Sequence, residues 1–292
     1  MRDSTYQSID PGWDAPARRK AEHDGPTSDN GTPTAVLLHG WPVTTGHWRF
    51  LVPALGTAGI TAVPVTLPGL GAAPAPEVTD FRKEALADLV RAQLARDGVT
   101  RYAVVGHDWG ATVGYLMAAA APDSVTALVV EEEILPGVDI EIPPAGRDHY
   151  PTWHGPFNRA AGLAEQLVPG REAAYYGTLL EQSAGPSGLD PTALHAYVEA
   201  YSAPGVLESG LAYYRTRCQD IDDVRALADR PIATPVLAIG GRYAMGNAVA
   251  GGLTALATDV TRLVAEQSGH YPAEQEPDVV NQAIVRFLQQ HC

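Results

Sequence analysis

The pentapeptide GHDWG, at residues 106–110, stands between the apolar run RYAVV and the small-residue stretch ATVGYLMAAAA. The apolar run is typical of a buried strand, and the small-residue stretch is typical of a helix. The pentapeptide between them is therefore predicted to be a strand-to-helix turn. Small residues two places either side of its centre allow a sharp, strained turn that exposes the central side chain at the carboxyl edge of a sheet. That side chain is Asp108, whose carboxylate can attack an electrophilic sp³ carbon and form an ester. The alternative is that Asp108 only caps the following helix.

Around this turn the chain alternates buried strands and helices. Strands are predicted at residues 34–39, 59–67, 101–106, 126–132, 234–240 and 261–266, and helices at 81–98, 111–121 and 277–290. Apolar strands separated by helices predict an α/β fold with a mostly parallel sheet that is covered on both faces. Between residues 137 and 230 the strand pattern stops, and aromatic, helix-compatible stretches predict a helical cap. The core is then expected to comprise 1–136 and 231–292, with the cap at 137–230.

Length, charge and cysteine content exclude several classes of protein. The chain has 292 residues, which suits one α/β domain with an insertion, and its net charge of −14 argues against nucleic acid or an anionic membrane as partner. No apolar run is long enough to span a membrane, and the N-terminus lacks an apolar signal core. Cys218 and Cys292 provide neither a disulfide framework nor a metal-binding spacing. We therefore expect a cytoplasmic protein.

A second motif, HGWP at residues 39–42, ends the first strong strand. With GHDWG it resembles the α/β-hydrolase family, in the branch of epoxide hydrolases and haloalkane dehalogenases, and the resemblance extends from residue 34 to the C-terminus. It implies the α/β-hydrolase fold, with the cap inserted after the strand that the family counts as its sixth, here 126–132. It also implies an oxyanion hole made by the backbone amides of Trp41 and Trp109.

The family places its general base in a loop after the last strand, where TRLVAEQSGHYP supplies His270. His270 would activate the water that hydrolyses the ester, and a carboxylate must hold its tautomer. His39 and His107 flank the two active-site turns and are expected to contact the substrate or support the site. Most other histidines are expected to be solvated, among them His23, His47 and His291.

The carboxylate that orients His270 has two positions in this branch. The usual one follows the strand TPVLAIG, but the next stretch, GRYAMGNAVAGG, contains no Asp or Glu. The other follows the strand 126–132, where three consecutive glutamates would be costly to bury without a purpose. Counted back from Pro136 against the family pattern, Glu132 is the acid, and strand alternation would point Glu131 and Glu133 the other way. A solvated acidic loop is the alternative.

The triad serves both epoxides and haloalkanes, so the substrate class depends on the groups that support the leaving atom. An opened epoxide leaves an alkoxide, which needs a strong hydrogen-bond donor, whereas indole N–H groups suffice for a halide. AYYRTR at 212–217 resembles the epoxide hydrolase cap motif and makes Tyr214 one donor. YPTWHGPF at 150–157 resembles the segment of the second donor, which in one bacterial subgroup is a histidine, here His154. That subgroup also places its acid after the sixth strand, in agreement with Glu132.

Two neighbours of these donors, Tyr213 and Trp153, are expected to contact the substrate. For the donors and their neighbours alike, the alternative is ordinary packing within the cap. Trp41 and Trp109 leave two indoles near the nucleophile, which keeps haloalkane dehalogenase as the runner-up.

The predicted function is therefore an epoxide hydrolase that forms a vicinal diol from an apolar epoxide through an Asp108 ester, without metal or organic cofactor. An apolar cap surface would also permit a homodimer. The chain departs from the family in residues 1–33, which lack a strand pattern, at Thr66 in place of a common aspartate, and at Ala72-Ala73 in place of a serine. These departures leave open an alternative function, that of a cyclase that acts on a biosynthetic intermediate. A binding protein is a third class, which the intact triad argues against.

Overall fold

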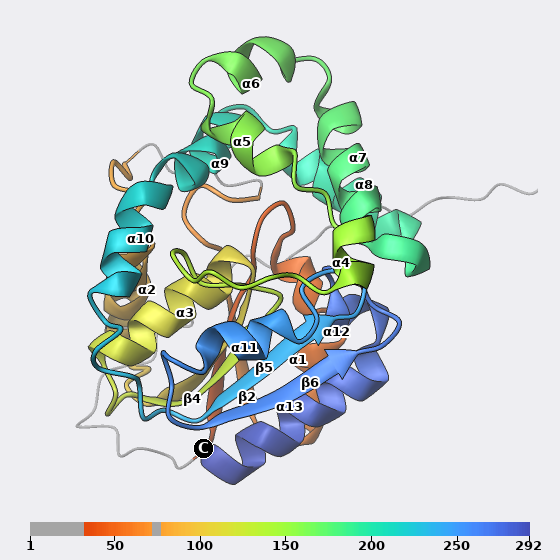
Figure 1. The fold of residues 1–292 in the computed structure, drawn as a ribbon. Helices are drawn as coiled ribbons and strands as arrows, with labels where there is room; N and C mark the ends of the chain where they lie inside the picture. The colour runs from red at the N-terminus through yellow and green to blue at the C-terminus, as the bar shows by residue number, and fades with distance from the viewer. Residues whose placement is uncertain (1–31, 72–76) are drawn as a thin grey trace, which may run out of the picture. The chain divides into compact units, whose positions relative to one another are not determined.

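In the computed structural model, which describes residues 32–71 and 77–292, six strands form one sheet (Figure 1). They are β1 (Thr34–Leu38), β2 (Thr61–Val65), β3 (Tyr102–His107), β4 (Val125–Glu131), β5 (Val236–Gly241) and β6 (Val260–Ala265). The order across the sheet is β2-β1-β3-β4-β5-β6, and every neighbouring pair is parallel. The six predicted strands are confirmed, with small shifts at their ends. The expectations for residues 1–31 and for Ala72-Ala73 lie outside the described residues.

Both faces of the sheet are buried, which explains why the strands read as continuous apolar runs. Val36 and Leu38 of β1 belong to the hydrophobic cluster on one face, and Ala35 and Leu37 to the cluster on the other. The first cluster includes side chains of α2 (Lys83–Arg96), α3 (Trp109–Ala120) and α11 (Ala248–Leu253). The second includes side chains of α1 (Leu51–Thr57), α12 (Pro272–Gln275) and α13 (Pro277–His291).

Between β4 and β5 the chain forms the helices of the region predicted as a cap. They are α4 (Pro144–His149), α5 (His154–Arg159), α6 (Leu163–Leu167), α7 (Glu172–Ser183), α8 (Pro191–Tyr201), α9 (Val206–Arg215) and α10 (Arg217–Arg225). Figure 1 shows α5 to α9 gathered together on one side of the sheet. Two short 3₁₀ turns complete the description, η1 (Thr45–Trp48) and η2 (Gly185–Ser187). Among the described residues, no helix has the length and apolar character needed to cross a membrane.

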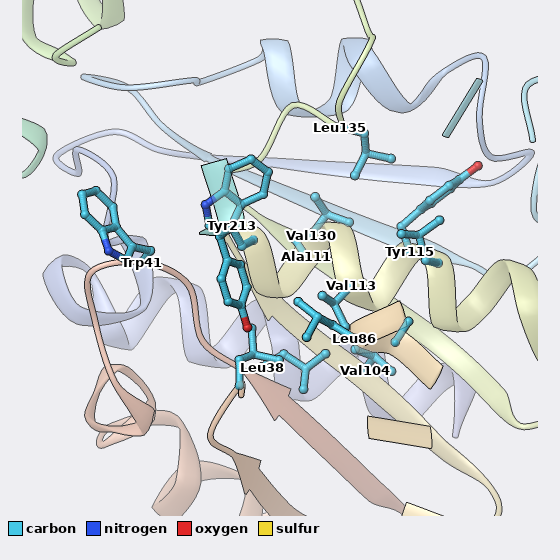
Figure 2. Packing of buried hydrophobic residues seen from close by; sticks show 14 of the residues in the cluster. Leu38, Trp41, Leu86, Val104, Ala111, Val113, Tyr115, Val130, Leu135 and Tyr213 are labelled. Atoms are coloured by element: carbon cyan, nitrogen blue, oxygen red, sulfur yellow. The ribbon is translucent and has the colours of Figure 1, made fainter. Parts of the chain in front are cut away.

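One hydrophobic cluster continues from the sheet into this region. It includes Leu38 and Val104 of the strands together with Tyr213 of α9, and Figure 2 shows these side chains close to one another. A buried ion pair joins the same parts, because Nζ of Lys83 on α2 lies 3.0 Å from Oδ2 of Asp220 on α10. Residues 32–292 accordingly form one compact unit. The boundaries of core and cap at residues 137 and 230 stay a prediction.

Candidate active site

Asp108 forms the turn between β3 and α3, at the carboxyl end of a central strand. Its backbone dihedrals are φ 50° and ψ −128°, a combination that residues with a side chain rarely adopt. Its amide donates a hydrogen bond of 3.0 Å to the Glu131 carbonyl, which ties the turn to the neighbouring strand. Strain of this kind persists only where the surrounding structure enforces it, and it is common at reacting groups.

Two glycines make room for this turn. A Cβ added to Gly106 would lie 2.5 Å from the carbonyl oxygen of Gly110, and one added to Gly110 would lie 2.2 Å from the carbonyl oxygen of Leu38. Both obstacles are main-chain atoms of packed elements, which cannot move aside as a flexible side chain could. Only glycine therefore fits either position without displacing β1 or α3.

We expect Gly110→Ala to lower the free energy of unfolding by about 1–3 kcal/mol, because the added methyl group overlaps the main chain of β1. Gly177→Ala is the matched control, since a Cβ at Gly177 in α7 meets no atom within 4 Å. Alanine there should stabilise the helix by about 0.5–1 kcal/mol. Chemical denaturation of the two variants measures the difference, and equal stabilities would contradict the steric argument.

The Asp108 carboxylate is almost fully buried, and its two oxygens face different partners. Oδ1 accepts a hydrogen bond of 2.9 Å from the Trp41 amide, and Oδ2 lies 3.5 Å from Nε2 of His270. The Trp41 amide is one of the two that were predicted to form the oxyanion hole. The other amide belongs to Trp109, the first residue of α3 and the chain neighbour of Asp108. The carboxylate is thus fixed by the main chain on one side and faces the imidazole on the other.

The three consecutive glutamates at the end of β4 are all buried, yet they lead to different partners. Glu131 accepts a bond of 2.7 Å from the Ala273 amide, on the face of the sheet that α1 and α13 cover. Glu133 accepts one of 2.7 Å from the Thr112 hydroxyl of α3, on the opposite face. The expectation that Glu131 and Glu133 share a side is wrong, because Glu132 has a φ of 52° and strand alternation stops there.

Glu132 turns its carboxylate to His270, which follows β6. Oε2 of Glu132 lies 2.9 Å from Nδ1 of His270, and Oε1 accepts bonds of 2.6 Å and 3.1 Å from the amides of Gly241 and Met245. These amides belong to the end of β5 and the loop that follows, where the usual acid is missing from the sequence. The loop therefore supplies backbone donors to a carboxylate that comes from β4.

The surrounding charges set the protonation of this site. Burial lowers the pKa of His270, but the hydrogen bonds and charges of Asp108 and Glu132 outweigh burial and raise the pKa to about 10. The imidazole is therefore protonated at neutral pH. Burial raises the pKa of Glu132, against the hydrogen bond and charge of His270. Burial, together with the charge of Asp108, raises the pKa of Glu133 to about 8. Glu133 thus keeps its proton at neutral pH and adds no further negative charge beside Asp108.

A cavity lies over Asp108. Residues of the predicted core line one part of it, namely Trp41, Pro42, Asp108, His270 and Tyr271, and residues of the predicted cap line the rest, namely Tyr150, His154, Leu179, Ser183 and Tyr214. Its free volume is about 10 Å³, close to the space that one water molecule needs. Among the residues that the structure describes, the lining contains no lysine or arginine, and His270 is the positively charged group in it.

The structure places both expected donors on this cavity. The ring of Tyr214 lies across the indoles of Trp41 and Trp109, with centroids 5.1 Å and 5.5 Å away, and His154 stacks on Trp41 at 6.1 Å. Burial and the charge of Asp108 raise the pKa of Tyr214 well above its ordinary value, so its hydroxyl stays protonated. Burial lowers the pKa of His154 to about 4, which leaves a neutral ring that can still donate one N–H.

Sequence reasoning missed Tyr150, which also lines the cavity and lies over His270 with ring centroids 5.0 Å apart. Burial and the charge of Asp108 hold the pKa of its phenol well above the ordinary value. Tyr150 opens the same segment, YPTWHGPF, that supplied His154. Pro151, which follows it, indicates a turn, but no local sequence pattern indicates which way the Tyr150 side chain points.

Sequence reasoning also missed the bonds between α7 and the His270 loop. The Ser183 carbonyl accepts a hydrogen bond of 2.8 Å from the His270 amide, and the Ser183 hydroxyl lies 2.7 Å from that of Tyr271. The next carbonyl, of Ala184, accepts one of 2.7 Å from the side chain of Gln275. The main chain of the expected general base is therefore held by the end of α7.

His39 and His107 flank the two turns, but neither lines the cavity. His39 is fully buried, and its Nε2 accepts a bond of 3.3 Å from the Leu67 amide. His107 is also fully buried, and its Nε2 donates a bond of 2.8 Å to the His270 carbonyl. Because their ring nitrogens bond the main chain, the geometry favours the supporting role among the two that were expected for them.

Tyr213 and Trp153 also lie outside the cavity lining, and their expected substrate contacts stay a prediction. Tyr213 is buried, and its hydroxyl donates a bond of 2.8 Å to the Pro68 carbonyl. Trp153 is 38% exposed, and its indole donates to the Gln182 side chain at the surface. Along α9, Tyr213 and Tyr214 point in different directions, as neighbours on a helix do.

His47 was expected to be solvated, and this expectation is wrong. Its side chain is fully buried between the carboxylates of Glu131 and Glu274. His291 is half-buried, with its ring 4.7 Å from that of Phe287, and His23 lies outside the described residues.

Comparisons with known proteins identify sequences and structures that are similar to this chain. A family model described as alpha/beta hydrolase fold matches residues 33–277. The chain is 29% identical over 270 residues to a soluble epoxide hydrolase of Corynebacterium sp. (strain C12), an alignment that covers 90% of this chain and 92% of that protein. It is 26% identical to a fluoroacetate dehalogenase of Burkholderia sp. over 88% of this chain and 87% of the other. The solved structure of the epoxide hydrolase CorEH is similar with a TM-score of 0.78 and 27% identity, covering 88% of this chain and 92% of that one.

Proposed function

The chain belongs to the α/β hydrolase fold family, in its epoxide hydrolase branch, and from this premise we propose that it opens neutral epoxides to vicinal diols through an ester of Asp108. One arrangement carries the proposal. A carboxylate on a strained turn is held by the Trp41 amide, faces His270 at 3.5 Å, and shares its cavity with two neutral donors, Tyr214 and His154. Fold alone would not license the reaction, so the argument rests on these groups.

In the first step an oxygen of the Asp108 carboxylate attacks one carbon of the epoxide. The carbon–oxygen bond of the ring breaks, and its electron pair stays on the ring oxygen. Tyr214 and His154 hydrogen-bond this oxygen, and Tyr214 transfers its proton to complete the first hydroxyl group. Esterification removes the negative charge of Asp108, so the pKa of His270 falls from about 10 and its proton can replace the one that Tyr214 gave.

In the second step the neutral His270 takes a proton from water, and the oxygen of that water attacks the ester carbonyl. The Trp41 and Trp109 amides stabilise the resulting oxyanion. Collapse of this intermediate releases the second alkoxide, which takes the proton from His270. Glu132 holds the imidazole in the tautomer that this exchange requires, and the regenerated Asp108 returns the remaining proton to His270.

The cavity favours a neutral epoxide over a haloacid or a haloalkane. Among the described residues no lysine or arginine lines it, so an anionic substrate would meet the Asp108 carboxylate with His270 as the one cation beside it. The indole pair is also poorly placed for a halide. Trp109 is absent from the lining, and a Cβ added to Gly210 of α9 would lie 3.0 Å from Nε1 of Trp41, so that nitrogen faces the helix backbone.

Isotope labelling tests the ester mechanism directly. A single turnover of an epoxide in H₂¹⁸O should give a diol with no label, because the oxygen added to carbon comes from Asp108, and the label should remain in the Asp108 carboxyl group. A labelled diol in that turnover would point to direct attack by water. Parallel incubation with haloalkanes and fluoroacetate, read as halide release, identifies a dehalogenase if only those compounds react.

Removal of the donors should slow ester formation and leave ester hydrolysis largely unchanged. We expect Tyr214→Phe and His154→Phe each to lower the rate of alkylation by an epoxide on the order of 10²-fold, the usual contribution of a positioned proton donor. Tyr213→Phe is the matched control, since that hydroxyl bonds the Pro68 carbonyl away from the cavity. Single-turnover mass spectrometry measures the rates, and equal effects at Tyr213 and Tyr214 would remove Tyr214 from the proposed donor pair.

A further inference from the structure

His47, which the proposed reaction does not use, is enclosed by chain neighbours of all three triad residues. Nε2 of His47 lies 3.2 Å from Oε2 of Glu131, the residue before Glu132. Nδ1 lies 2.8 Å from Oε1 of Glu274, four residues after His270.

The third neighbour is His107, the residue before Asp108. The rings of His47 and His107 stack with centroids 4.3 Å apart and an interplanar angle of 28°. Nε2 of His107 in turn donates to the carbonyl oxygen of His270 at 2.8 Å. One imidazole in η1 therefore contacts the segments that deliver the proposed nucleophile, base and acid.

The contacts require His47 to be an imidazolium. A carboxylate oxygen only accepts hydrogen bonds, so a ring that bonds two ionised carboxylates must carry a proton on each nitrogen. Burial lowers the pKa of His47, but the charges and hydrogen bonds of Glu131 and Glu274 outweigh it and raise the pKa to about 9. His107 beside it stays neutral, because burial and the charge of His47 lower its pKa well below the ordinary value.

The two carboxylates that His47 joins are themselves bound to the His270 loop and to the cap. The other oxygen of Glu131 accepts a bond of 2.7 Å from the Ala273 amide, within α12. Oε1 of Glu274 also accepts one of 2.7 Å from the Tyr197 hydroxyl of α8, and Arg49 pairs with Oε2. Without His47, Glu131 and Glu274 would face one another as two buried negative charges, and the loop that carries His270 would have to shift.

We propose that His47 is a positioning residue for ester hydrolysis, which holds the His270 loop against the end of β4 so that His270, Glu132 and Asp108 keep their relative places. The inference rests on the proposed ester mechanism, and it assigns His47 to the second step in particular. Alkylation depends on Asp108 and the cap donors, which His47 does not contact. Hydrolysis depends on the placement of His270, and a displacement of about 1 Å can reduce a rate on the order of 10²-fold.

The test compares the two half-reactions in a single turnover, followed by mass spectrometry of the ester as it forms and decays. In His47→Gln, and independently in Glu274→Gln, ester hydrolysis should slow by on the order of tenfold to hundredfold while ester formation changes by less than about threefold. Glu274→Gln retains an acceptor for Tyr197, so it carries the test if His47→Gln does not fold. Ile284→Ala is the stability control, because Ile284 is buried in α13 and belongs to the hydrophobic cluster on the same face of the sheet.

A purely structural role predicts a different result. It would lower the melting temperature of His47→Gln and of Ile284→Ala alike, with both half-reactions unchanged at temperatures where the proteins are folded. Unchanged hydrolysis in both glutamine variants, or equal slowing of the two half-reactions, overturns the inference while the ester mechanism stands. If the wild-type protein forms no ester with any epoxide, the proposed function fails first and the role assigned to His47 fails with it.

Discussion

Asp108→Asn is expected to form no covalent adduct with any epoxide and to lose turnover by on the order of 10⁴-fold or more, as removal of a covalent nucleophile does. The amide oxygen is a much weaker nucleophile than a carboxylate. The backbone of the turn should survive, since its conformation depends on Gly106 and Gly110 rather than on the side-chain charge. Intact-protein mass spectrometry after incubation with epoxides measures the adduct, whose mass equals that of the whole substrate.

The first control for Asp108→Asn is a peptide map of the same protein sample. Asn and Asp differ by about one mass unit, so a map of the peptide that contains residue 108 detects any deamidation that would restore the carboxylate. A second control, Glu133→Gln, removes a buried carboxyl that bonds Thr112 and holds its proton at neutral pH. It should leave the adduct intact. An adduct of undiminished yield in Asp108→Asn would place the nucleophile elsewhere.

His270→Gln should separate the two steps. Alkylation should continue within about tenfold of the wild-type rate, because the Asp108 carboxylate and the cap donors remain. Ester hydrolysis should fall by on the order of 10³-fold or more, because no base is left to take the proton of the attacking water. The covalent ester should therefore accumulate to one equivalent and be visible as a stable mass increase, which cleavage of the protein should map to Asp108.

A matched variant distinguishes loss of the base from a general disturbance of the loop. Gln275→Leu removes the bonds that this side chain donates to the Ala184 and Gly188 carbonyls and accepts from the Gly269 and Tyr271 amides on either side of His270, but it leaves the imidazole in place. It should turn over with a smaller loss and without lasting accumulation of ester. Rapid hydrolysis of the ester in His270→Gln would mean that another group activates the water.

Most of the fold could be predicted, because strands buried on both faces produce apolar runs that need no partner to be recognised. β3 and the turn after it are the best example, since GHDWG encodes both the strained backbone and the proposed nucleophile locally. The roles proposed for Asp108 and His270 follow from motif context alone. Glu132 required a comparison with the family pattern, and the structure brings its carboxylate to 2.9 Å from His270.

The contacts that sequence reasoning missed join residues far apart in the chain. His47 lies in a short polar turn that reads as solvated, and the carboxylates that bury it are 84 and 227 residues away. The same holds for Lys83, whose partner Asp220 is 137 residues further on. Cap residues were the least predictable, because the side of a helix or turn that faces the cavity is set by tertiary packing. Tyr214 was named as a donor, while Tyr150 was not.

The attachment of α7 to the main chain of His270 has a consequence for redesign of this protein. The free volume over Asp108 admits about one water molecule, so broader substrates call for a roomier cap. Substitutions that displace α7 would also move the Ser183 carbonyl, to which the His270 amide is bonded. Selection for activity on bulkier substrates would then enrich variants that form the Asp108 ester once and do not hydrolyse it. A screen that measures only the disappearance of the epoxide would select such variants, whereas a screen that measures release of the diol would not.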